Sequence, residues 1–276
     1  MSQSKEVVFV DVETLSEGFS EFSLPQTTDL VGKEIVLHYE EDYTVTLNFL
    51  DDQTLRAVYQ KGDEIESVGA NYLAVSPKKD VYFVDFIWSV GFTKSITTVL
   101  DLGDQIATTS IGILPTLAEA DISNYRRYTD NLPLSSVKAI FHHAAINRPF
   151  TPATKKHKKT SRLVGERIQF KYSNNDVYEH VYLNENFYTW HCLKGVEAGL
   201  CDTDACHYYD LGHNLVWFVW REKIVPTLGS VIEDFDAMRS FGKLYGYKNS
   251  IQEETIINFS AGSYAKMLNS TKYDFD

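Results

Sequence analysis

The sequence predicts an all-β protein built from two consecutive copies of one antiparallel domain. Two observations carry this prediction. A long part of the chain repeats itself with an offset of 133 residues, and hydrophobic residues fall in short runs rich in β-branched and aromatic side chains. Aromatic residues make up 13% of the 276-residue chain, which favours strands and ligand cavities over helical bundles.

The repeat begins with "LVGKEIVLHY" at Leu30 and "LVGERIQFKY" at Leu163. The same offset relates Tyr39 to Tyr172 and, much further along both copies, still relates "TTVLDL" to "SVIEDF" without a gap. A register that survives over this distance indicates a duplicated domain.

Short strand-like runs follow one another within each copy, separated by Gly, Asp, Asn and Lys. The first copy has them at 34–39, 44–50, 81–88, 95–102 and 106–114. The second copy has them at 167–172, 177–183, 187–193, 206–211, 215–222, 229–235 and 240–247. Their even spacing predicts an antiparallel meander that either closes into a barrel or folds into a sandwich.

A segment of different composition joins the two copies. Residues 134–146, "LSSVKAIFHHAAI", are predicted to form one helix with Ser135 or Ser136 as its N-cap. The basic run "KKHKK" at 155–159 fits a solvated linker in a chain whose net charge is -12.

The composition limits the partners and the compartment. A net charge of -12 disfavours both nucleic acid and an anionic membrane as partners. Acids interrupt the first residues where a signal peptide needs an apolar core, and no run approaches the ~20 apolar residues of a spanning helix. Three cysteines do not suggest a secreted disulfide framework. We therefore expect a cytoplasmic protein whose partner is a small organic ligand, with a monomer and a homodimer both left open.

Residues 188–209, "YTWHCLKGVEAGLCDTDACHYY", concentrate the cysteines and two histidines. His191, Cys192, Cys201, Cys206 and His207 offer enough donors for zinc, but no pair has C-x2-C or H-x3-H spacing, and adjacent residues of a strand point to opposite faces. Cysteine–histidine catalysis needs a proximity that the sequence does not establish. We interpret the stretch as two strands and their connection, and we expect no metal.

The second copy resembles the C-terminal part of the MoaF family in "VYLNENFYTWHCLKGVEAGLCDTDACHYY", "LVWFVWREKIVPTLG" and "MRSFGKLYGY". The first copy resembles the family's N-terminal domain. The family is named for an association with molybdenum cofactor biosynthesis, so the resemblance implies an accessory role in that process as one alternative.

The second copy also shows a distant resemblance to phenolic acid decarboxylases, in "LVGERIQFKYSNNDVYE", "GVEAG" and "WRE". Those enzymes are small lipocalin-like (calycin) barrels. The resemblance implies two such antiparallel barrels in tandem. The first, at 1–117, is expected to be a structural or pocket-covering copy. A linker with a helix at 118–160 follows, and the second barrel at 161–276 is expected to carry the site.

In the decarboxylases, tyrosines inside the barrel handle the substrate's phenol, and a glutamate and an arginine handle its acid end, with no cofactor. Tyr172 matches one phenol-handling tyrosine, whereas Phe170 replaces the other. Tyr178 matches a further barrel tyrosine, and Glu222 matches the glutamate. Leu200 replaces the arginine, which removes the bidentate clamp for a carboxylate. The resemblance therefore implies a different reaction in a related cavity.

The alternation of side chains along a strand limits where Glu222 can point. Phe218, Trp220 and Glu222 share one face of a strand, and Arg221 lies on the other. If Trp220 faces the interior, Glu222 lies beside an indole and is partly desolvated. Desolvation raises the pKa of a carboxyl and suits it to proton transfer near neutral pH.

The same rule applies to the neighbouring strand. Tyr188, Trp190 and Cys192 share a face, and His191 lies opposite. The decarboxylase comparison favours Trp190 inside. At the offset of 133 residues, the first copy has Ala57, Ile87 and Ser89 in place of the two tryptophans and the acid, so we expect the site in the second barrel or facing the interface of the two.

These observations favour an enzyme of the lyase, isomerase or cyclase type that acts by acid–base chemistry on a small aromatic or polyunsaturated molecule. The alternative is a non-catalytic carrier. The sequence contains no P-loop and no G-x-G-x-x-G opening a helix, so we expect no cofactor. The catalytic candidates are Glu222, Tyr172, Tyr178 and His191. The substrate-binding candidates are Trp190, Trp220, Phe170, Phe218, Glu179, Arg221 and Leu200.

Overall fold

The computed structural model describes residues 8–274, and most of them belong to two closed antiparallel barrels of eight strands. Both barrels follow the chain as a meander, so each strand pairs with the next one and the last pairs with the first. The predicted fold, two antiparallel barrels in tandem with a short helical linker, is confirmed.

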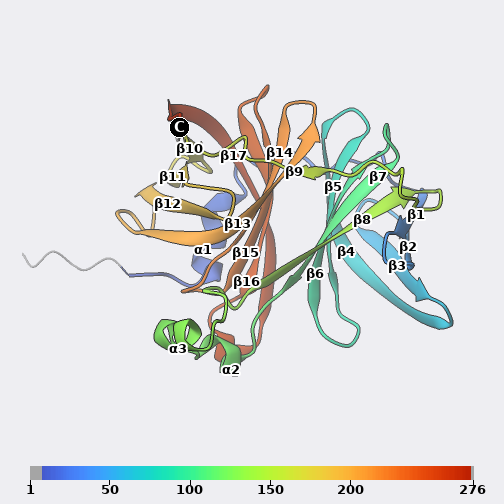
Figure 1. Ribbon diagram of the computed structural model, residues 1–276, viewed down its shortest axis with the longest axis horizontal. Coiled ribbons are helices and arrows are strands. Elements are labelled where there is room, and N and C mark those ends of the chain that lie inside the picture. The colour runs from blue at the N-terminus through green and yellow to red at the C-terminus, as the bar shows by residue number, and fades with distance from the viewer. Residues whose placement is uncertain (1–7, 275–276) are drawn as a thin grey trace, which may run out of the picture. The chain divides into compact units, whose positions relative to one another are not determined.

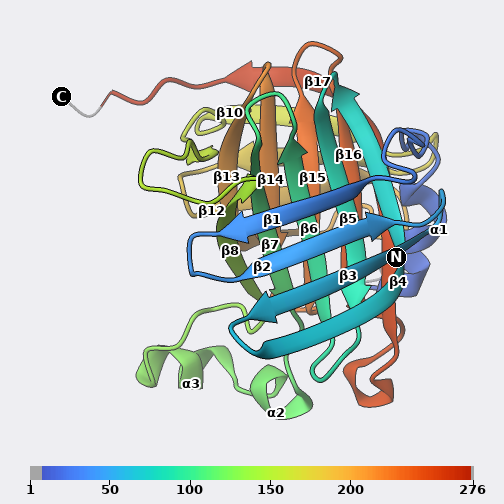
Figure 2. The same cartoon turned by 90° about the vertical axis from the view of Figure 1, so that its right-hand side faces the viewer.

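The first barrel, called here the N-terminal barrel, is closed by the pairing of its last strand with its first. Figure 2 shows its first four strands in front of the other four. The strands are β1 Glu34–Tyr39, β2 Thr44–Phe49, β3 Thr54–Lys61, β4 Glu64–Lys78, β5 Val81–Trp88, β6 Lys94–Asp101, β7 Ile106–Ile113 and β8 Lys138–Ile146.

The second barrel, called here the C-terminal barrel, is closed by pairing between β12 and β13 (Figure 1). The two-residue strand β9 Lys158–Lys159 adds to the edge of β13. The strands of the barrel are β10 Glu166–Lys171, β11 Val177–Tyr182, β12 Phe187–Lys194, β13 Cys201–Gly212, β14 Leu215–Arg221, β15 Thr227–Asp234, β16 Arg239–Tyr247 and β17 Ile256–Ser270.

The internal repeat is visible strand by strand. β2 and β6 each begin and end 133 residues before β11 and β15, and the starts of β3 and β7 precede those of β12 and β16 by the same distance. The last strands, β8 and β17, break this register because the connections before them differ in length. The duplication therefore includes seven of the eight strands in one register.

The predicted helix at 134–146 is wrong, because residues 138–146 form β8. This strand pairs with β7 on one side and with β1 on the other, so it fills the gap that seven strands would leave. Closing the barrel satisfies two rows of backbone hydrogen-bonding groups, and this outweighs the helix propensity of the alanines and lysine. The linker still contains two short helices, α2 Leu117–Ala120 and α3 Asn124–Thr129.

The compact units are discontinuous in the sequence and differ from the expected bounds 1–117, 118–160 and 161–276. One unit comprises Leu24–Ile113 and Lys138–Lys158. The other combines residues 8–23, Leu114–Val137 and 159–274. The N-terminal segment thus belongs to the unit of the C-terminal barrel.

The helix α1 Val12–Phe19 is the part of that segment that reaches the barrel interior (Figure 1). Asp11 caps it by accepting a hydrogen bond from the Thr14 backbone N–H at 2.7 Å. Val12, Leu15 and Phe19 are buried and form its apolar face. Gly18 lies so close to Asp176 that an added Cβ would be 2.0 Å from its carboxyl oxygen, which shows how tightly α1 is packed.

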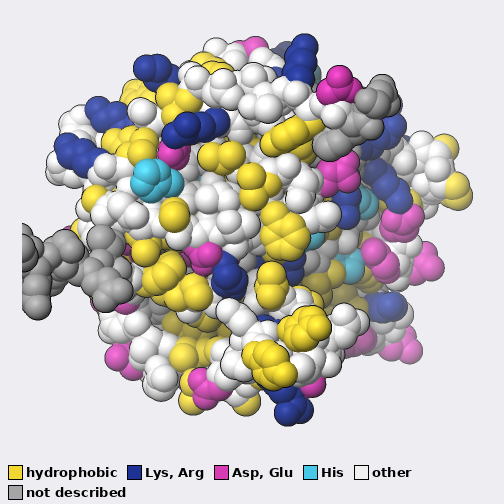
Figure 3. All heavy atoms as spheres, turned by 60° about the vertical axis from the view of Figure 1, so that its left-hand side comes forward, with side chains coloured by type: hydrophobic (Ala, Val, Ile, Leu, Met, Phe, Trp, Pro, Cys, Tyr) yellow, Lys and Arg dark blue, Asp and Glu magenta, His cyan; other side chains and the backbone are white. Residues whose placement is uncertain are grey.

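None of the helices within residues 8–274 is both long and apolar enough to cross a membrane. The short 3-10 turn Ile251–Glu253 completes the helical elements of the described chain. Figure 3 shows hydrophobic side chains in small scattered groups between charged ones on the face that it presents.

Candidate functional site

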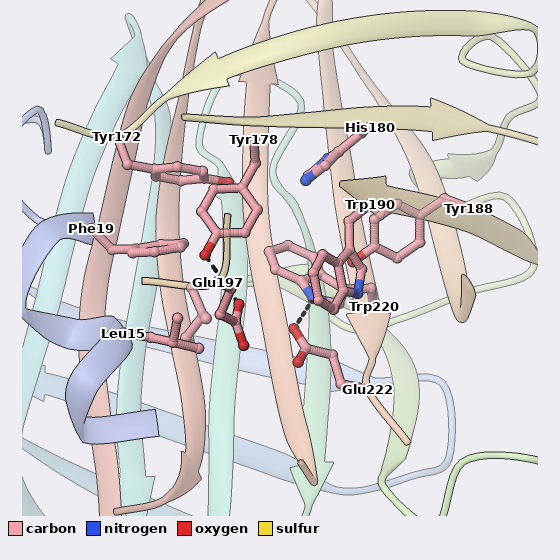
Figure 4. A pocket seen from close by; sticks show the side chains of 11 residues that line it. Leu15, Phe19, Tyr172, Tyr178, His180, Tyr188, Trp190, Glu197, Trp220 and Glu222 are labelled. Carbon is pink, nitrogen blue, oxygen red and sulfur yellow. Dashed lines mark hydrogen bonds between the residues drawn. The ribbon is translucent and has the colours of Figure 1, made fainter. Parts of the chain in front are cut away.

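The aromatic side chains inside the C-terminal barrel surround a small cavity of about 30 Å³. A buried water needs roughly 10–15 Å³, so this space holds one or two waters and no larger molecule. Figure 4 shows the aromatic rings and two carboxyl groups that point into it. The lining residues are Leu15, Phe19, Tyr172, Tyr178, His180, Tyr188, Trp190, Glu197, Trp220, Glu222 and Leu244.

Strand parity places the predicted aromatic residues as expected. Trp190 and Trp220 both line the cavity, and so do Tyr172 and Tyr178. The prediction that Trp190 faces inward with His191 opposite is therefore confirmed. Each strand contributes alternate residues, because successive side chains of a strand leave opposite faces of the sheet.

Helix α1 fills the part of the barrel that would otherwise enlarge this cavity. The Phe19 ring stacks on Tyr172 with ring centres 4.2 Å apart, and it meets Tyr178 edge to face at 5.4 Å. Leu15 lies one turn earlier on the same face of the helix and lines the cavity beside Phe19. The size of the cavity thus depends on a segment that lies far from the barrel in the sequence.

Glu222 is the acid that the sequence placed beside an indole, and this placement is confirmed. The Trp220 Nε1–H donates a hydrogen bond to Glu222 Oε1 at 2.9 Å. Burial, followed by the negative charge of Asp204, raises the pKa of Glu222 well above its usual range. A carboxyl whose pKa is raised in this way keeps its proton to a higher pH than an ordinary glutamic acid and is suited to donate it.

A second acid, Glu197, reaches the cavity from the connection between β12 and β13. Its side chain is 4% exposed, and it accepts a hydrogen bond from the Tyr178 hydroxyl at 3.1 Å. Burial raises the pKa of Glu197 above its ordinary value. The Tyr178 pKa is raised as well, by burial and by the nearby Glu197 charge, so the phenol stays protonated.

A third buried acid, Asp204, acts on Glu222 through its negative charge, which raises the pKa of Glu222. Asp204 is 1% exposed and accepts a hydrogen bond from Trp190 Nε1–H at 3.0 Å. Lys223 Nζ lies 3.5 Å from Asp204 and 2.5 Å from Asp202. Burial raises the pKa of Asp204 above its ordinary value, and the positive charge of Lys223 opposes that rise.

A chain of buried polar groups continues from the cavity into the barrel. The His180 imidazole lines the cavity, and its Nδ1 is 3.3 Å from the Tyr182 hydroxyl. Tyr182 in turn donates a hydrogen bond to Glu233. Burial lowers the pKa of His180 to about 3 and raises the pKa of Glu233 to about 8. The imidazole is therefore neutral, and the carboxyl is largely protonated at pH 7.

Three predicted site residues lie away from the cavity. Glu179 is buried, and its carboxylate accepts hydrogen bonds from Arg167 at 2.7 and 2.9 Å and from His191 Nδ1–H at 2.8 Å. This cluster lies on the outward face of β11 and β12, since Tyr178 and Trp190 occupy the inward face. Arg221 is on the face of β14 opposite Trp220.

Three more predicted residues pack around the cavity without lining it. Phe170, Phe218 and Leu200 belong to the same hydrophobic core, and Phe218 stacks on Trp220 with ring centres 5.0 Å apart. The sequence reasoning missed His180, although it has the same strand parity as Tyr178. It also missed Glu197, Tyr188, Leu244 and the two residues of α1 as lining residues.

The cysteine- and histidine-rich stretch 188–209 covers most of β12, the connection and most of β13, as predicted. Cys192 and Cys206 are buried in the barrel core, and Cys201 is exposed. Within residues 8–274, no three His, Cys, Asp or Glu side chains are grouped in a way that would hold a metal ion.

Comparison with known proteins gives a consistent relationship over the length of the chain. The MoaF N-terminal domain matches residues 7–116, and the MoaF C-terminal domain matches residues 157–271. Protein MoaF of Klebsiella aerogenes is 35% identical over 272 residues, which are 98% of this chain and 99% of that protein. Among solved structures, a chain from Burkholderia vietnamiensis described as a beta-lactamase aligns with a TM-score of 0.33 and 11% identity, over 40% of this chain and 100% of that one.

Proposed function

We propose, from the premise that the chain belongs to the MoaF family, that its C-terminal barrel binds a small aromatic or polyunsaturated molecule and moves a proton on it. The observation that carries the proposal is the pair Glu222 and Glu197. Both carboxyls point into one aromatic cavity, and burial raises the pKa of each. Perturbed carboxyl groups in a concave site are typical of acid–base catalysis.

The proposed roles follow from the contacts. Glu222 donates its proton to one atom of the bound molecule, and the carboxylate form of Glu197 accepts a proton from another atom. Tyr178, already hydrogen-bonded to Glu197, and Tyr172 bind a hydroxyl or carbonyl group. Trp190 and Trp220 pack against the unsaturated part. One proton enters the molecule and one leaves, so the reaction is an isomerisation or, if a bond closes or breaks, a cyclisation or elimination.

Access requires that α1 moves. The cavity of about 30 Å³ cannot hold such a molecule while Leu15 and Phe19 occupy the barrel. An isolated helix of eight residues is not stable in water, so α1 holds its place by packing and by contacts such as the Lys248–Glu13 ion pair at 2.9 Å. We propose that the ligand displaces the Leu15 and Phe19 side chains when it binds.

The experiment uses deuterium as a label for proton transfer. A mixture of apolar metabolites is incubated in D₂O with the wild-type protein, with Glu222→Gln and with the control Glu185→Gln, which changes an exposed acid of the same barrel. Mass spectrometry then searches for molecules that gain deuterium or change in mass. The wild type and the control should transform the same molecule, and Glu222→Gln should be slower by about 100-fold or more.

A carrier gives a different result. A non-catalytic binding protein would retain its ligand in both variants and would transform nothing in D₂O. Native mass spectrometry of the purified protein adds the identity of any molecule that purifies with it. A molybdenum cofactor precursor bound at one copy per chain would favour the accessory role that the family name suggests and would contradict the proposal.

A further inference from the structure

The N-terminal barrel contains a much larger cavity than the C-terminal barrel, although the sequence comparison suggested that it was only structural or pocket-covering. The volume is about 360 Å³, which lies within the roughly 300–1,000 Å³ of ordinary small-molecule sites. No helix supplies a lining residue, because every lining residue except Tyr43 belongs to one of the strands β1–β8, and Tyr43 lies in the turn between β1 and β2. The empty space is therefore a property of this barrel alone.

The walls of this cavity are flat and aromatic. Tyr39 and Tyr43 stack with ring centres 4.3 Å apart and planes inclined by 10°, and Tyr43 lies 5.3 Å from Tyr59. Val45 and Trp88 are also part of the lining. Rings arranged in this way favour a planar, mainly apolar ligand, because such a molecule buries the most surface against them.

One part of the cavity carries hydroxyl groups. The Tyr39 hydroxyl is 2.7 Å from Thr109 Oγ1, which is 2.9 Å from Thr98 Oγ1. All three residues line the cavity. Three hydroxyls joined by two hydrogen bonds leave one proton and several lone pairs for a further partner. A ligand with a neutral hydrogen-bonding group can use them.

The charges nearby disfavour an anion. Glu64 and Glu66 belong to the lining, and the Glu41 carboxylate is hydrogen-bonded to Nδ1 of the lining residue His142 at 2.9 Å. Lys94 is the one lysine among the lining residues. Carboxylates outnumber the lysine, so an added negative charge would be repelled.

We propose that the N-terminal barrel is a second ligand site, for a planar and mainly apolar molecule that carries one neutral hydrogen-bonding group and no negative charge. The aromatic stack binds the ring system, and the hydroxyl chain of Tyr39, Thr109 and Thr98 orients it. This site does not depend on the function proposed for the C-terminal barrel, since no residue is shared between the two cavities.

Two fluorescent probes with one ring system test the proposal. N-phenyl-1-naphthylamine is neutral and has one N–H group, whereas 1-anilinonaphthalene-8-sulfonate adds a negative charge to the same rings. The full-length protein should bind the neutral probe with about one molecule per chain, and it should bind the sulfonate at least tenfold more weakly. Equal affinity for both probes would overturn the charge requirement, and no binding of the neutral probe would overturn the site.

Matched variants locate the binding. Val45→Phe places a ring inside the cavity, whereas Val58→Phe places the same ring on the outward face of β3, one residue before the lining residue Tyr59. Val45→Phe should weaken the neutral probe at least tenfold, and Val58→Phe should change its affinity less than twofold. Thermal unfolding checks that both variants fold. If Val45→Phe does not fold, Ile111→Phe, at another lining residue, replaces it. Binding that survives both cavity-filling variants would place the probe elsewhere and refute the proposal.

Discussion

The C-terminal barrel should lose stability as the pH rises, because of the buried carboxyl of Glu233. Replacing Glu233 by glutamine should remove much of this loss. Glu233 is 2% exposed, and burial raises its pKa from an ordinary 4.5 to about 8. A carboxyl whose pKa is higher in the folded state contributes its full stability below the unfolded-state pKa. It loses that contribution as the pH rises through the folded-state pKa.

The size of this stability loss follows from the two pKa values of Glu233, 4.5 in the unfolded state and about 8 in the folded state. Their difference corresponds to roughly 5 kcal/mol in total, of which about 3.5 kcal/mol is lost between pH 5 and pH 8. Glutamine retains an oxygen that can accept the hydrogen bond from Tyr182. It has no charge to bury, so the variant lacks this part of the pH dependence.

The assay is urea unfolding at pH 5 and pH 8, followed by tryptophan fluorescence. Three of the four tryptophans, Trp190, Trp217 and Trp220, lie in the C-terminal barrel, so the signal reports mainly on that unit. Between the two pH values, the wild type should lose about 3.5 kcal/mol more than Glu233→Gln. The exposed control Glu185→Gln should behave as the wild type does. Equal losses in the wild type and Glu233→Gln would mean that Glu233 is ionised when folded, and the reasoning would be refuted.

Two further predictions concern α1 and the cysteines. Phe19→Ala should lower the free energy of unfolding by about 3–4 kcal/mol, because the ring is 5% exposed and stacks on Tyr172. Phe22→Ala, at a more exposed ring, should cost less, and similar costs in urea unfolding would show that α1 does not fill the barrel. A thiol reagent should modify Cys201 quickly and the other two cysteines only after denaturation, because both are buried and burial raises their pKa. Rapid modification of all three in the native protein would contradict the described core.

The sequence was sufficient for the parts of the fold that local pattern controls. The repeat and the alternating strands predicted two antiparallel meanders, and the resemblance to lipocalin-like barrels implied that both close. Parity put Glu222 on the same face as Trp220, and the decarboxylase comparison favoured Trp190 inside. The same parity argument could have identified His180, because it lies two residues after Tyr178 on the same strand. The error at 134–146 arose because the segment reads as helical in isolation, whereas the open edge between β7 and β1 decides its structure.

Other parts of the site depend on tertiary structure. Nothing local in residues 12–19 indicates that Leu15 and Phe19 enter a barrel that begins far along the chain. Glu197 lies in a connection, where strand parity gives no direction. The larger cavity of the N-terminal barrel was missed for a similar reason, because matching the two copies position by position compared Ala57, Ile87 and Ser89 and passed over Tyr43 and Tyr59.

The protonation of Glu222 at neutral pH tests the central claim most directly. Infrared spectra of the wild type and of Glu222→Gln are recorded at pH 7, and their difference isolates the band of this one side chain. We predict the carbonyl stretch of a protonated carboxyl, because burial and the Asp204 charge raise the pKa of Glu222 well above its usual range. The two stretches of an ionised carboxylate at that pH would contradict the proposed proton donor.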